Sequence, residues 1–232
     1  MFEQRARGTE LLDSPGADAS DAVASYRFMR MVNLLGGARP VKQFVARCAQ
    51  DNPNRPLHVL DVGAGDGSLA RSVCRWASTN NLDLRFTCVD MDRSAAARAA
   101  IILDDNDRVR FLHTDVFSLE PDGYDCVTAS MFLHHFPDER LSEVVAHLAG
   151  LAGGPLLVND LRRSWATYAA AWMLSLGFAP AVRHDATLSV LRGFRPQELA
   201  DKLNDIPGAD VRTGHSFPGR IWAEVRLSGD RI

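Results

Sequence analysis

Short apolar segments alternate with amphipathic segments through the central part of the chain, from about residue 57 to residue 160. Apolar runs typical of buried strands lie near 58–62, 84–90, 108–112, 123–130 and 154–160. Between them, apolar residues recur at helical spacing near 67–79, 92–103 and 137–151. This alternation predicts right-handed crossovers around a parallel sheet, and therefore an α/β fold.

The segments before this core have a different pattern. Residues 1–19 are polar and contain the helix-breaking pair Pro15-Gly16, so we expect a mobile arm there. Apolar residues at helical spacing predict a helix over 20–35, and a second helix over about 39–51 begins with proline in its first turn.

The segments after the core predict helices and then a hairpin. Ser164 is a suitable N-cap for an amphipathic helix. Residues 177–194 are expected to form a loop or lid, and a further helix is expected over about 196–205. The last two apolar runs, Ala209–Ser216 and Arg220–Leu227, predict a terminal hairpin.

Size and charge restrict the class of protein. The chain has 232 residues, which is enough for one α/β domain with a substantial core, and a net charge of −3. Without a clustered basic surface we expect no nucleic acid partner. The N-terminus lacks a signal peptide and no stretch has the roughly 20 apolar residues of a membrane span, so a cytoplasmic protein is expected. The scattered cysteines are interpreted as reduced core residues: Cys48, Cys74, Cys88 and Cys126.

The first strand ends in a glycine-rich turn, Asp61-x-Gly63-x-Gly65-x-Gly67. Glycine lets the backbone bend sharply and approach a ligand, and the following helix directs its N–H groups to the same place. This arrangement indicates a nucleotide-type cofactor. A dinucleotide site would need a glycine where Ser68 stands. Because Asp61 and Asp66 would repel phosphate, a cofactor with cationic groups fits better.

Two further predicted strands also end on an acid, at Asp90 and Asp115. Asp90 lies in the window where a carboxylate meets a ribose diol, and Met91 is placed to pack on an adenine. The alternative is that Asp90 caps the next helix, although Asp92 suits that role better.

The glycine-rich turn resembles motif I of the class I S-adenosylmethionine (SAM)-dependent methyltransferases. The resemblance implies a Rossmann-like, mostly parallel seven-stranded sheet that ends in an antiparallel hairpin, with N-terminal helices. It also implies SAM as cofactor and S-adenosylhomocysteine (SAH) as product, with Asp115 at the adenine amino group. The implied cofactor-binding residues are Asp61, Gly63, Ala64, Gly65, Asp90, Met91, Asp115, Val116 and Ser130.

Two histidines follow the fourth strand, at the sheet edge where ligands bind in open α/β sheets. The run Leu133-His134-x-Phe136-x-Asp138-Glu139 is similar to one in small-molecule O-methyltransferases that act on phenols, which implies that His134 is a general base. It is also similar to Leu-His-His stretches of quinone C-methyltransferases, in which the histidine need not be a base. A third interpretation is that His134 or His135 only makes local hydrogen bonds.

Polar residues after the fifth strand are candidates for contacts with the substrate. Asn159 and Asp160 are placed to orient the substrate or to pair with a histidine, so His134, His135 and Asp160 form the candidate catalytic set. Arg162 either binds a carboxylate or enolate oxygen or pairs with Asp160.

The helix that follows carries Trp165, Tyr168 and Trp172, which line an apolar substrate pocket or simply pack in the core. His184 is a weaker candidate for a second acid or base. No group of Cys, His and Asp has metal-ligand spacing, so no metal is expected.

The sequence therefore predicts a methyltransferase that acts on a small aromatic or polyketide-like acceptor, most simply at a hydroxyl oxygen. The alternatives are methylation of a quinone or phenol ring carbon, an NAD-dependent oxidoreductase, which Ser68 argues against, and a non-catalytic SAM-binding protein. Residues 1–56 would form a substrate cap, and residues 57–232 the SAM-binding core with an insert at about 161–205. We expect no membrane partner, and either a monomer or a homodimer.

Overall fold

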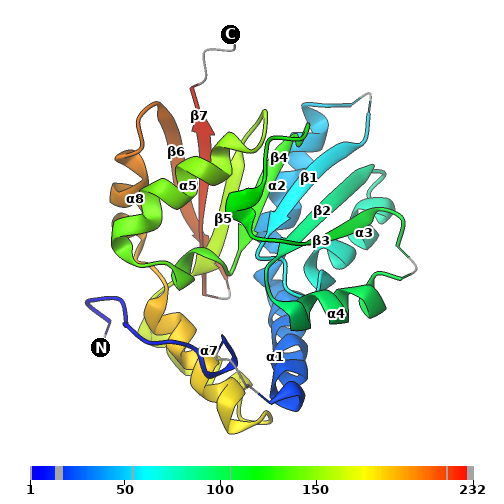
Figure 1. Ribbon diagram of the computed structural model, residues 1–232. Coiled ribbons are helices and arrows are strands. Elements are labelled where there is room, and N and C mark those ends of the chain that lie inside the picture. The colour runs from blue at the N-terminus through cyan, green and yellow to red at the C-terminus, as the bar shows by residue number, and fades with distance from the viewer. Residues whose placement is uncertain (1, 14–17, 54, 105, 218, 229–232) are drawn as a thin grey trace.

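A seven-stranded sheet forms the centre of the computed structural model, which describes residues 2–13, 18–53, 55–104, 106–217 and 219–228 (Figure 1). The strands are β1 Leu57–Val62, β2 Leu84–Asp90, β3 Val109–His113, β4 Cys126–Ser130, β5 Leu156–Leu161, β6 Ala209–Ser216 and β7 Arg220–Leu227. Their order is β3-β2-β1-β4-β5-β7-β6, with β1–β5 parallel and β7 antiparallel to both neighbours. This confirms the predicted fold class, including the terminal hairpin.

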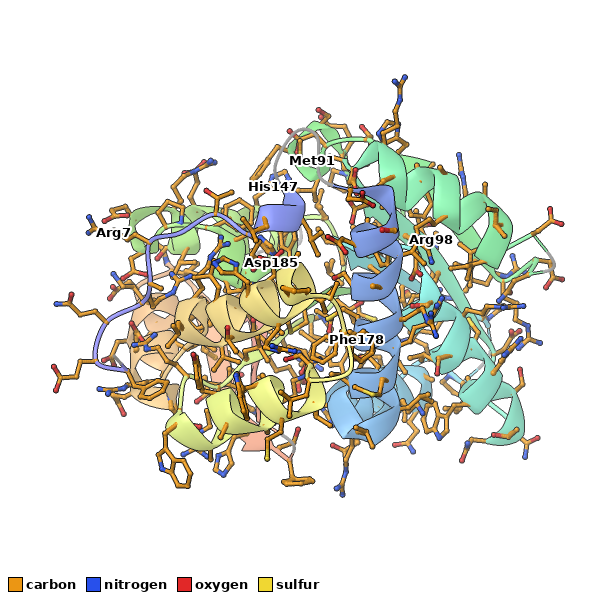
Figure 2. The ribbon with its side chains drawn as sticks, turned by 90° about the horizontal axis from the view of Figure 1, so that it is seen from below. Arg7, Met91, Arg98, His147, Phe178 and Asp185 are labelled. Carbon is orange, nitrogen blue, oxygen red and sulfur yellow. The ribbon has the colours of Figure 1, made fainter. Side chains whose placement is uncertain are left out.

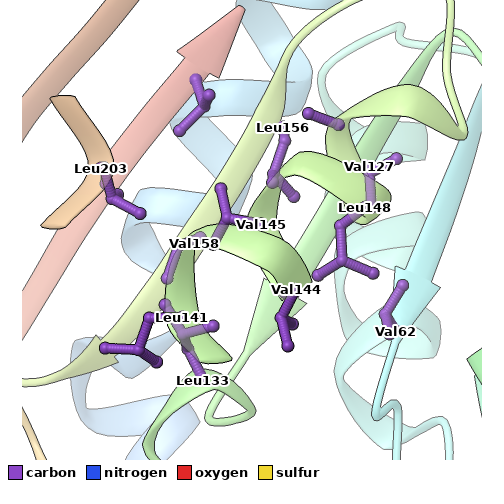
Figure 3. Close-up of a cluster of buried hydrophobic side chains, with 14 of the residues drawn as sticks. Val62, Val127, Leu133, Leu141, Val144, Val145, Leu148, Leu156, Val158 and Leu203 are labelled. Carbon is purple, nitrogen blue, oxygen red and sulfur yellow. The ribbon is translucent and has the colours of Figure 1, made fainter. Parts of the chain in front are cut away.

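Helices cover both faces of the sheet. One face packs against α2 (Arg39–Gln50), α3 (Ser68–Thr79) and α4 (Arg93–Ile102). The other packs against α5 (Leu141–Gly150) and α8 (Pro196–Asn204), where Val144, Val145 and Leu148 lie against the strands (Figure 3). Because both faces of the central strands β1, β4 and β5 are covered, most of their residues are buried and apolar, which made them readable in the sequence.

A third layer lies beyond the carboxyl ends of the parallel strands (Figure 1). It consists of α1 (Ala19–Val32), α6 (Trp165–Leu174) and α7 (Pro180–Arg192). Short helical turns complete the described chain: η1 Leu11–Asp13, η2 Asn33–Gly37, η3 Val116–Ser118, η4 Leu133–His135 and η5 Asp138–Arg140. This layer covers the edge of the sheet where a ligand is expected.

The loop or lid predicted over 177–194 is wrong, because residues 180–192 form the helix α7. Val182, Ala186 and Val190 recur every four residues and line one side of this helix toward a cavity described below. The polar pair His184-Asp185 between them obscured the pattern in the sequence.

The mobile arm predicted over 1–19 is also wrong for the part that the structure describes, and Pro15-Gly16 lies outside it. Residues 2–13, here called the N-terminal strap, lie along α7 (Figure 2). The Ala6 N–H donates to the Leu191 carbonyl (3.0 Å), and Asp185 accepts from the backbone N–H groups of Leu11 (2.8 Å) and Leu12 (2.9 Å).

The cysteines and the helices agree with two further predictions. All four cysteines are buried and unpaired, as expected for core residues. Across the described ranges, no helix combines the length and the apolar character that crossing a membrane requires.

Candidate active site

The glycine-rich turn adopts a backbone conformation that other residues rarely adopt. Gly63, Gly65 and Gly67 have φ values of 62°, 56° and 71°, all in the left-handed region. A Cβ atom on Gly63 would lie 2.3 Å from the Phe132 ring, and one on Gly65 3.1 Å from the Tyr26 ring. The turn therefore needs glycine for both its conformation and its close contacts.

The two acids of this turn have opposite environments. Asp61 is buried and accepts a hydrogen bond from the Thr128 hydroxyl (2.7 Å), and burial raises its pKa to about 7. Asp66, by contrast, lies beside Arg30 (3.4 Å) and Arg98 (3.8 Å). Two guanidinium groups therefore lie beside Asp66, so of the two acids it is Asp61 that we expect to lie near the cationic groups of a cofactor.

Asp90 ties the end of β2 to the glycine-rich turn. Its carboxylate accepts hydrogen bonds from the backbone N–H groups of Gly65 (2.8 Å) and Asp92 (2.9 Å), and burial raises its pKa. Asp92, not Asp90, caps α4, because it accepts from the N–H groups of Ser94 and Ala95. The capping alternative for Asp90 is thus excluded, and its carboxylate is held at the edge of the sheet.

The remaining predicted cofactor residues lie along the same edge. Met91 is exposed beyond β2 (Figure 2), and Val116 is buried beyond β3. Asp115 is exposed, and its carboxylate accepts from the Phe117 N–H (3.0 Å). The Ser130 hydroxyl at the end of β4 accepts from the Asn159 side chain (2.8 Å). Ala64 is half-buried within the turn.

His134 and Asp160 form a buried pair, as one of the sequence interpretations expected. His134 Nδ1 donates to Asp160 Oδ1 (2.7 Å), and the His134 backbone N–H donates to Oδ2 (3.1 Å). Asp160 is held in turn by the Leu161 N–H (2.7 Å). Asp160 therefore fixes both the position and the tautomer of the histidine.

The N-terminal strap adds a carboxylate to this pair, which the sequence did not predict. Glu10 Oε1 lies 3.5 Å from His134 Nε2, on the opposite side of the ring from Asp160, and accepts from the Ser189 hydroxyl (2.7 Å). Burial lowers the pKa of His134, but Asp160 and Glu10 outweigh it and raise that pKa to about 9. Burial likewise raises the pKa of Glu10, but His134 outweighs it and lowers that pKa to about 2.

Two arginines clamp the turn that carries His134. The His134 carbonyl accepts from Arg5 of the strap (3.1 Å) and from Arg192 at the end of α7 (3.2 Å). The strap, α7 and Asp160 of β5 lie far apart in the sequence, and together they set the position of His134.

A cavity of about 760 Å³ lies between the sheet edge and the covering helices. It extends from Asp92 and Ser94 after β2 to Ser216 and Arg220 on the hairpin, and His134, His135 and Arg162 line it. Most of its wall is apolar and comes from α1, α6 and α7: Ala22, Phe28, Met29, Val32, Ala166, Ala170, Ala171, Met173, Leu174, Val182, Ala186 and Val190. A cavity of this size and character fits a small organic molecule.

The aromatic residues predicted to line this cavity do not do so. Trp165 and Trp172 are 73% and 46% exposed, and Tyr168 packs on Phe2 of the strap, 5.9 Å between ring centroids. None of the three is among the lining residues, because the opposite side of α6, rich in alanine, faces the cavity. His184 is exposed, pairs with Asp185 (2.9 Å) and does not line the cavity either.

Glu10, His134 and His135 together have the geometry of a cation site. Each offers one ligand atom, and these atoms lie within 4.8 Å of one another. The expectation that no metal-ligating group exists rested on sequence spacing, which does not reveal a carboxylate 124 positions before the first histidine. Because His134 is protonated at neutral pH in this arrangement, a metal ion would have to displace that proton.

The residues of the sheet edge fit SAM. Asp61 is a buried carboxyl whose raised pKa would fall beside a cation, and SAM carries a sulfonium and an ammonium group. Gly63 and Gly65 expose a backbone that a Cβ would block, and Asp90 holds a carboxylate beside them, as ribose binding requires.

Comparison with known proteins agrees with this geometry. Residues 59–152 match the family model described as Methyltransferase domain. The chain is 38% identical over 167 residues to the Uncharacterized methyltransferase Rv0089 of Mycobacterium tuberculosis, covering 66% of this chain and 80% of that protein. It is 31% identical over 159 residues to a Ubiquinone biosynthesis O-methyltransferase of Pectobacterium atrosepticum, covering 64% of this chain and 61% of that enzyme.

Solved structures show the same fold at low identity. The plantazolicin methyltransferase BamL, crystallised with a desmethylplantazolicin analogue and SAH, superposes with a TM-score of 0.72 at 12% identity, covering 94% of this chain and 93% of that chain. The magnesium protoporphyrin IX methyltransferase of Synechocystis PCC 6803 with bound SAM gives 0.59 at 19% identity, covering 97% and 100%. The chain belongs to the class I SAM-dependent methyltransferases, with SAM as its cofactor and SAH as its product.

Proposed function

We propose that this enzyme methylates a hydroxyl oxygen of a small, largely apolar acceptor bound in the cavity, with His134 as the general base. The observation that carries the proposal is the His134–Asp160 pair at the cavity wall, because Asp160 holds Nδ1 and leaves Nε2 directed away from it. The ubiquinone-pathway relative, an O-methyltransferase by its name, supports transfer to oxygen.

Bound SAM supplies a methyl group on a sulfonium, which is already activated for displacement. This chain's residues have to align the acceptor, exclude water and remove a proton. His134 Nε2 takes the proton of the acceptor hydroxyl, and Asp160 stabilises the imidazolium that forms. The apolar wall from α1, α6 and α7 keeps water from the reacting oxygen.

Glu10 has to leave His134 before the base can act. With Glu10 in place the pKa of His134 is about 9, so at neutral pH the ring already carries the proton that it should accept. An acceptor hydroxyl that takes the position of the Glu10 carboxylate removes a negative charge from Nε2 and lowers that pKa. We infer that the strap moves when the acceptor binds, and that residues 1–56 and the 161–205 insert act as the substrate cap.

On the cofactor side, we assign the ribose to Asp90, the adenine to Met91, Asp115 and Val116, and the methionine part to the turn of Asp61, Gly63, Ala64 and Gly65 with Ser130. Support comes from their alignment along the carboxyl edge of β1–β4.

The variant His134→Gln tests the assignment of the base. We expect turnover to fall by about a hundredfold or more while SAH affinity stays within twofold. Turnover is followed by SAH release with a panel of phenols and hydroxyquinones. His58→Gln is the control, because His58 bonds to Thr87 (2.9 Å) in the core strands β1 and β2 and should leave the rate unchanged.

The position of the methyl group distinguishes the two chemistries. Carbon NMR of product made with methyl-¹³C SAM identifies an oxygen-bound or a carbon-bound methyl group directly. Wild-type turnover in His134→Gln would remove this residue from the mechanism, and a carbon-bound methyl group would establish C-methylation of a quinone or phenol ring instead.

A further inference from the structure

Two buried polar atoms without a hydrogen-bond partner, Ser216 Oγ and Arg220 Nε, belong to side chains that line the cavity. Within the described residues, buried side-chain nitrogen or oxygen atoms that lack a hydrogen-bond partner belong to Arg98, Asn159, Arg183, Ser216 and Arg220. Of these, only Ser216 and Arg220 line the cavity. Unsatisfied buried donors are rare in folded proteins, so their coincidence with a ligand cavity indicates a ligand that satisfies them.

The hairpin places these two side chains next to each other. Ser216 at the end of β6 pairs directly with Arg220 at the start of β7, so both side chains lie on the same face of the sheet. Arg220 also pairs with Leu161 at the end of β5, which brings it to the carboxyl edge beside the acceptor cavity.

Another buried arginine shows what a saturated guanidinium looks like in this protein. Arg163 bonds to the Glu198 carboxylate (2.7 Å) and to the carbonyls of Phe2 (3.1 Å), Glu3 (3.3 Å) and Gly193 (2.5 Å). Arg220 is 0% exposed, yet among the described residues its guanidinium donates hydrogen bonds only to the Met131 sulfur and, at 3.4 Å, to the Asn33 side chain. No carboxylate of the described chain forms an ion pair with it.

The nearest acid does not compensate the charge of Arg220. Asp160 attracts it, but both Asp160 oxygens are bonded to His134 and Leu161. Burial lowers the pKa of Arg220 to about 10, so the group stays cationic at neutral pH. A buried cation without a counterion is unfavourable, and an anionic ligand relieves that cost. Arg162 lines the same end of the cavity and adds positive charge there.

Resting on the function proposed above, we propose that the methyl acceptor is an organic acid whose carboxylate binds Arg220 and Ser216 while its hydroxyl faces His134. Guanidinium and hydroxyl groups donate to carboxylate oxygens, and charge-assisted bonds of this kind are strong. The apolar wall between the two ends suits the hydrocarbon part of the acceptor. The substrate class is therefore a hydroxylated aromatic or polyketide-like carboxylic acid.

Binding of matched probe pairs tests this site without any methyl transfer. The probes are benzoate, cinnamate and 2-naphthoate, each against its primary amide, measured by calorimetry and thermal shift on the full chain with SAH present. We expect at least one carboxylate to bind wild type tenfold or more tightly than its amide. If no carboxylate of the set exceeds its amide, the proposal is wrong.

Variants of the two proposed ligand residues show which side chains cause the preference for a carboxylate over its amide. Arg220→Met should bring each acid and its amide within twofold of each other, and Ser216→Ala should reduce the preference about threefold. In the absence of carboxylates Arg220→Met should also melt at the same or a higher temperature, because a neutral side chain of similar length replaces an uncompensated charge. Arg226→Met, at an exposed position of the same strand, is the control and should change nothing. A preference that survives Arg220→Met but disappears in Arg162→Met would overturn the assignment.

The carboxylate of the cofactor's own methionine part is the other source of an anion. We expect Arg220→Met to leave SAH affinity within twofold of wild type. If SAH binds more weakly to the variant while 5′-methylthioadenosine, which lacks that carboxylate, binds as before, the site belongs to the cofactor and the acceptor proposal fails. A defect in His134 catalysis alters none of these binding results, so the two proposals can fail separately.

Discussion

The two halves of the sheet edge are built in different ways. The proposed cofactor half lies at the ends of β1–β3 with Ser130 at the end of β4, and backbone groups around Gly63, Gly65 and Asp90 form much of it. The proposed acceptor half lies where β5 and β6 end and β7 begins, next to the turn of His134 after β4, and it is assembled from side chains as far apart in the sequence as Glu10 and Arg220.

This difference explains how far each half could be predicted. A backbone-based site needs particular residue types at fixed spacing, which the sequence displays directly. A site made of convergent side chains depends on which segments fold against one another, and no local pattern records that. We therefore propose that the cofactor half is the more predictable from sequence, and that the acceptor half determines which substrate this enzyme binds.

The largest effect is expected from Asp160→Asn, which breaks the acceptor half alone. An amide at this position no longer holds the His134 tautomer or stabilises its cation, so turnover should fall on the order of a hundredfold to a thousandfold. SAH affinity, measured by calorimetry, should stay within twofold. An equal loss of SAH binding would show that the two halves are not independent.

The turn of the cofactor half is tested by Gly63→Ala. Alanine in the left-handed region costs about 1–2 kcal/mol, and the clash with Phe132 adds to it, so we expect a loss of about 3 kcal/mol in the free energy of unfolding. Gly123→Ala is the matched control, since Gly123 has a φ of 66° but a Cβ atom there would have no neighbour within 4 Å. Equal losses in urea denaturation would mean that the contact with Phe132 is unimportant.

Asp90→Ala tests the cofactor half through the proposed contact of Asp90 with the ribose. It removes the carboxylate assigned to the ribose diol, and SAM affinity should weaken by about 2 kcal/mol. Acceptor-side binding of the carboxylate probes should not change. Unaltered SAM affinity in a folded variant would refute the ribose assignment.

Glu10→Gln should change how stability depends on pH. The pKa of His134 is raised to about 9. The contribution of His134 to the free energy of unfolding is therefore complete below pH 6.5, its usual pKa, and is lost as the pH rises through 9. The lowered pKa of Glu10, about 2, means that its contribution is present above 4.5 and is lost as the pH falls through 2. With respect to these two groups, wild type should therefore be most stable between pH 4.5 and 6.5, where both contributions are complete.

In Glu10→Gln the loss of stability between pH 6.5 and 9 should shrink by on the order of 1–2 kcal/mol, because the variant no longer favours the imidazolium as strongly. Urea denaturation at the two pH values measures it. Glu3→Gln, an exposed position on the same strap, is the control. If Glu10→Gln and wild type showed the same pH dependence, Glu10 would not be raising the pKa of His134.

The smallest effect is expected from Trp172→Ala. Trp172 is 46% exposed and does not line the cavity, so the acceptor KM should change less than twofold and stability by less than about 0.5 kcal/mol. Ala170→Leu on the cavity side of the same helix should instead raise the acceptor KM, because it adds bulk to the wall. A large increase in the acceptor KM for Trp172→Ala would instead support the interpretation from sequence that the aromatic residues of α6 line the pocket.

The sequence by itself determined the architecture and the cofactor. The central strands are covered on both faces and mostly apolar, the terminal hairpin has its own turn signal, and Gly63 and Gly65 stand where a left-handed turn needs them. It also placed His134 and Asp160 at neighbouring strand ends, because parallel strands 4 and 5 share a carboxyl edge.

Only the tertiary structure decided what surrounds that pair. The strap looked like a mobile arm because its polar residues find partners on α7, not within their own segment, and so Glu10 gave no local signal. The side of α6 that faces the cavity carries alanines while its tryptophans face solvent, against the usual preference. Arg220 is buried without an ion-pair partner among the described residues at the start of β7, where the hairpin turn meets the end of β5. Each of these features depends on contacts across the chain, and a pattern along the chain records none of them.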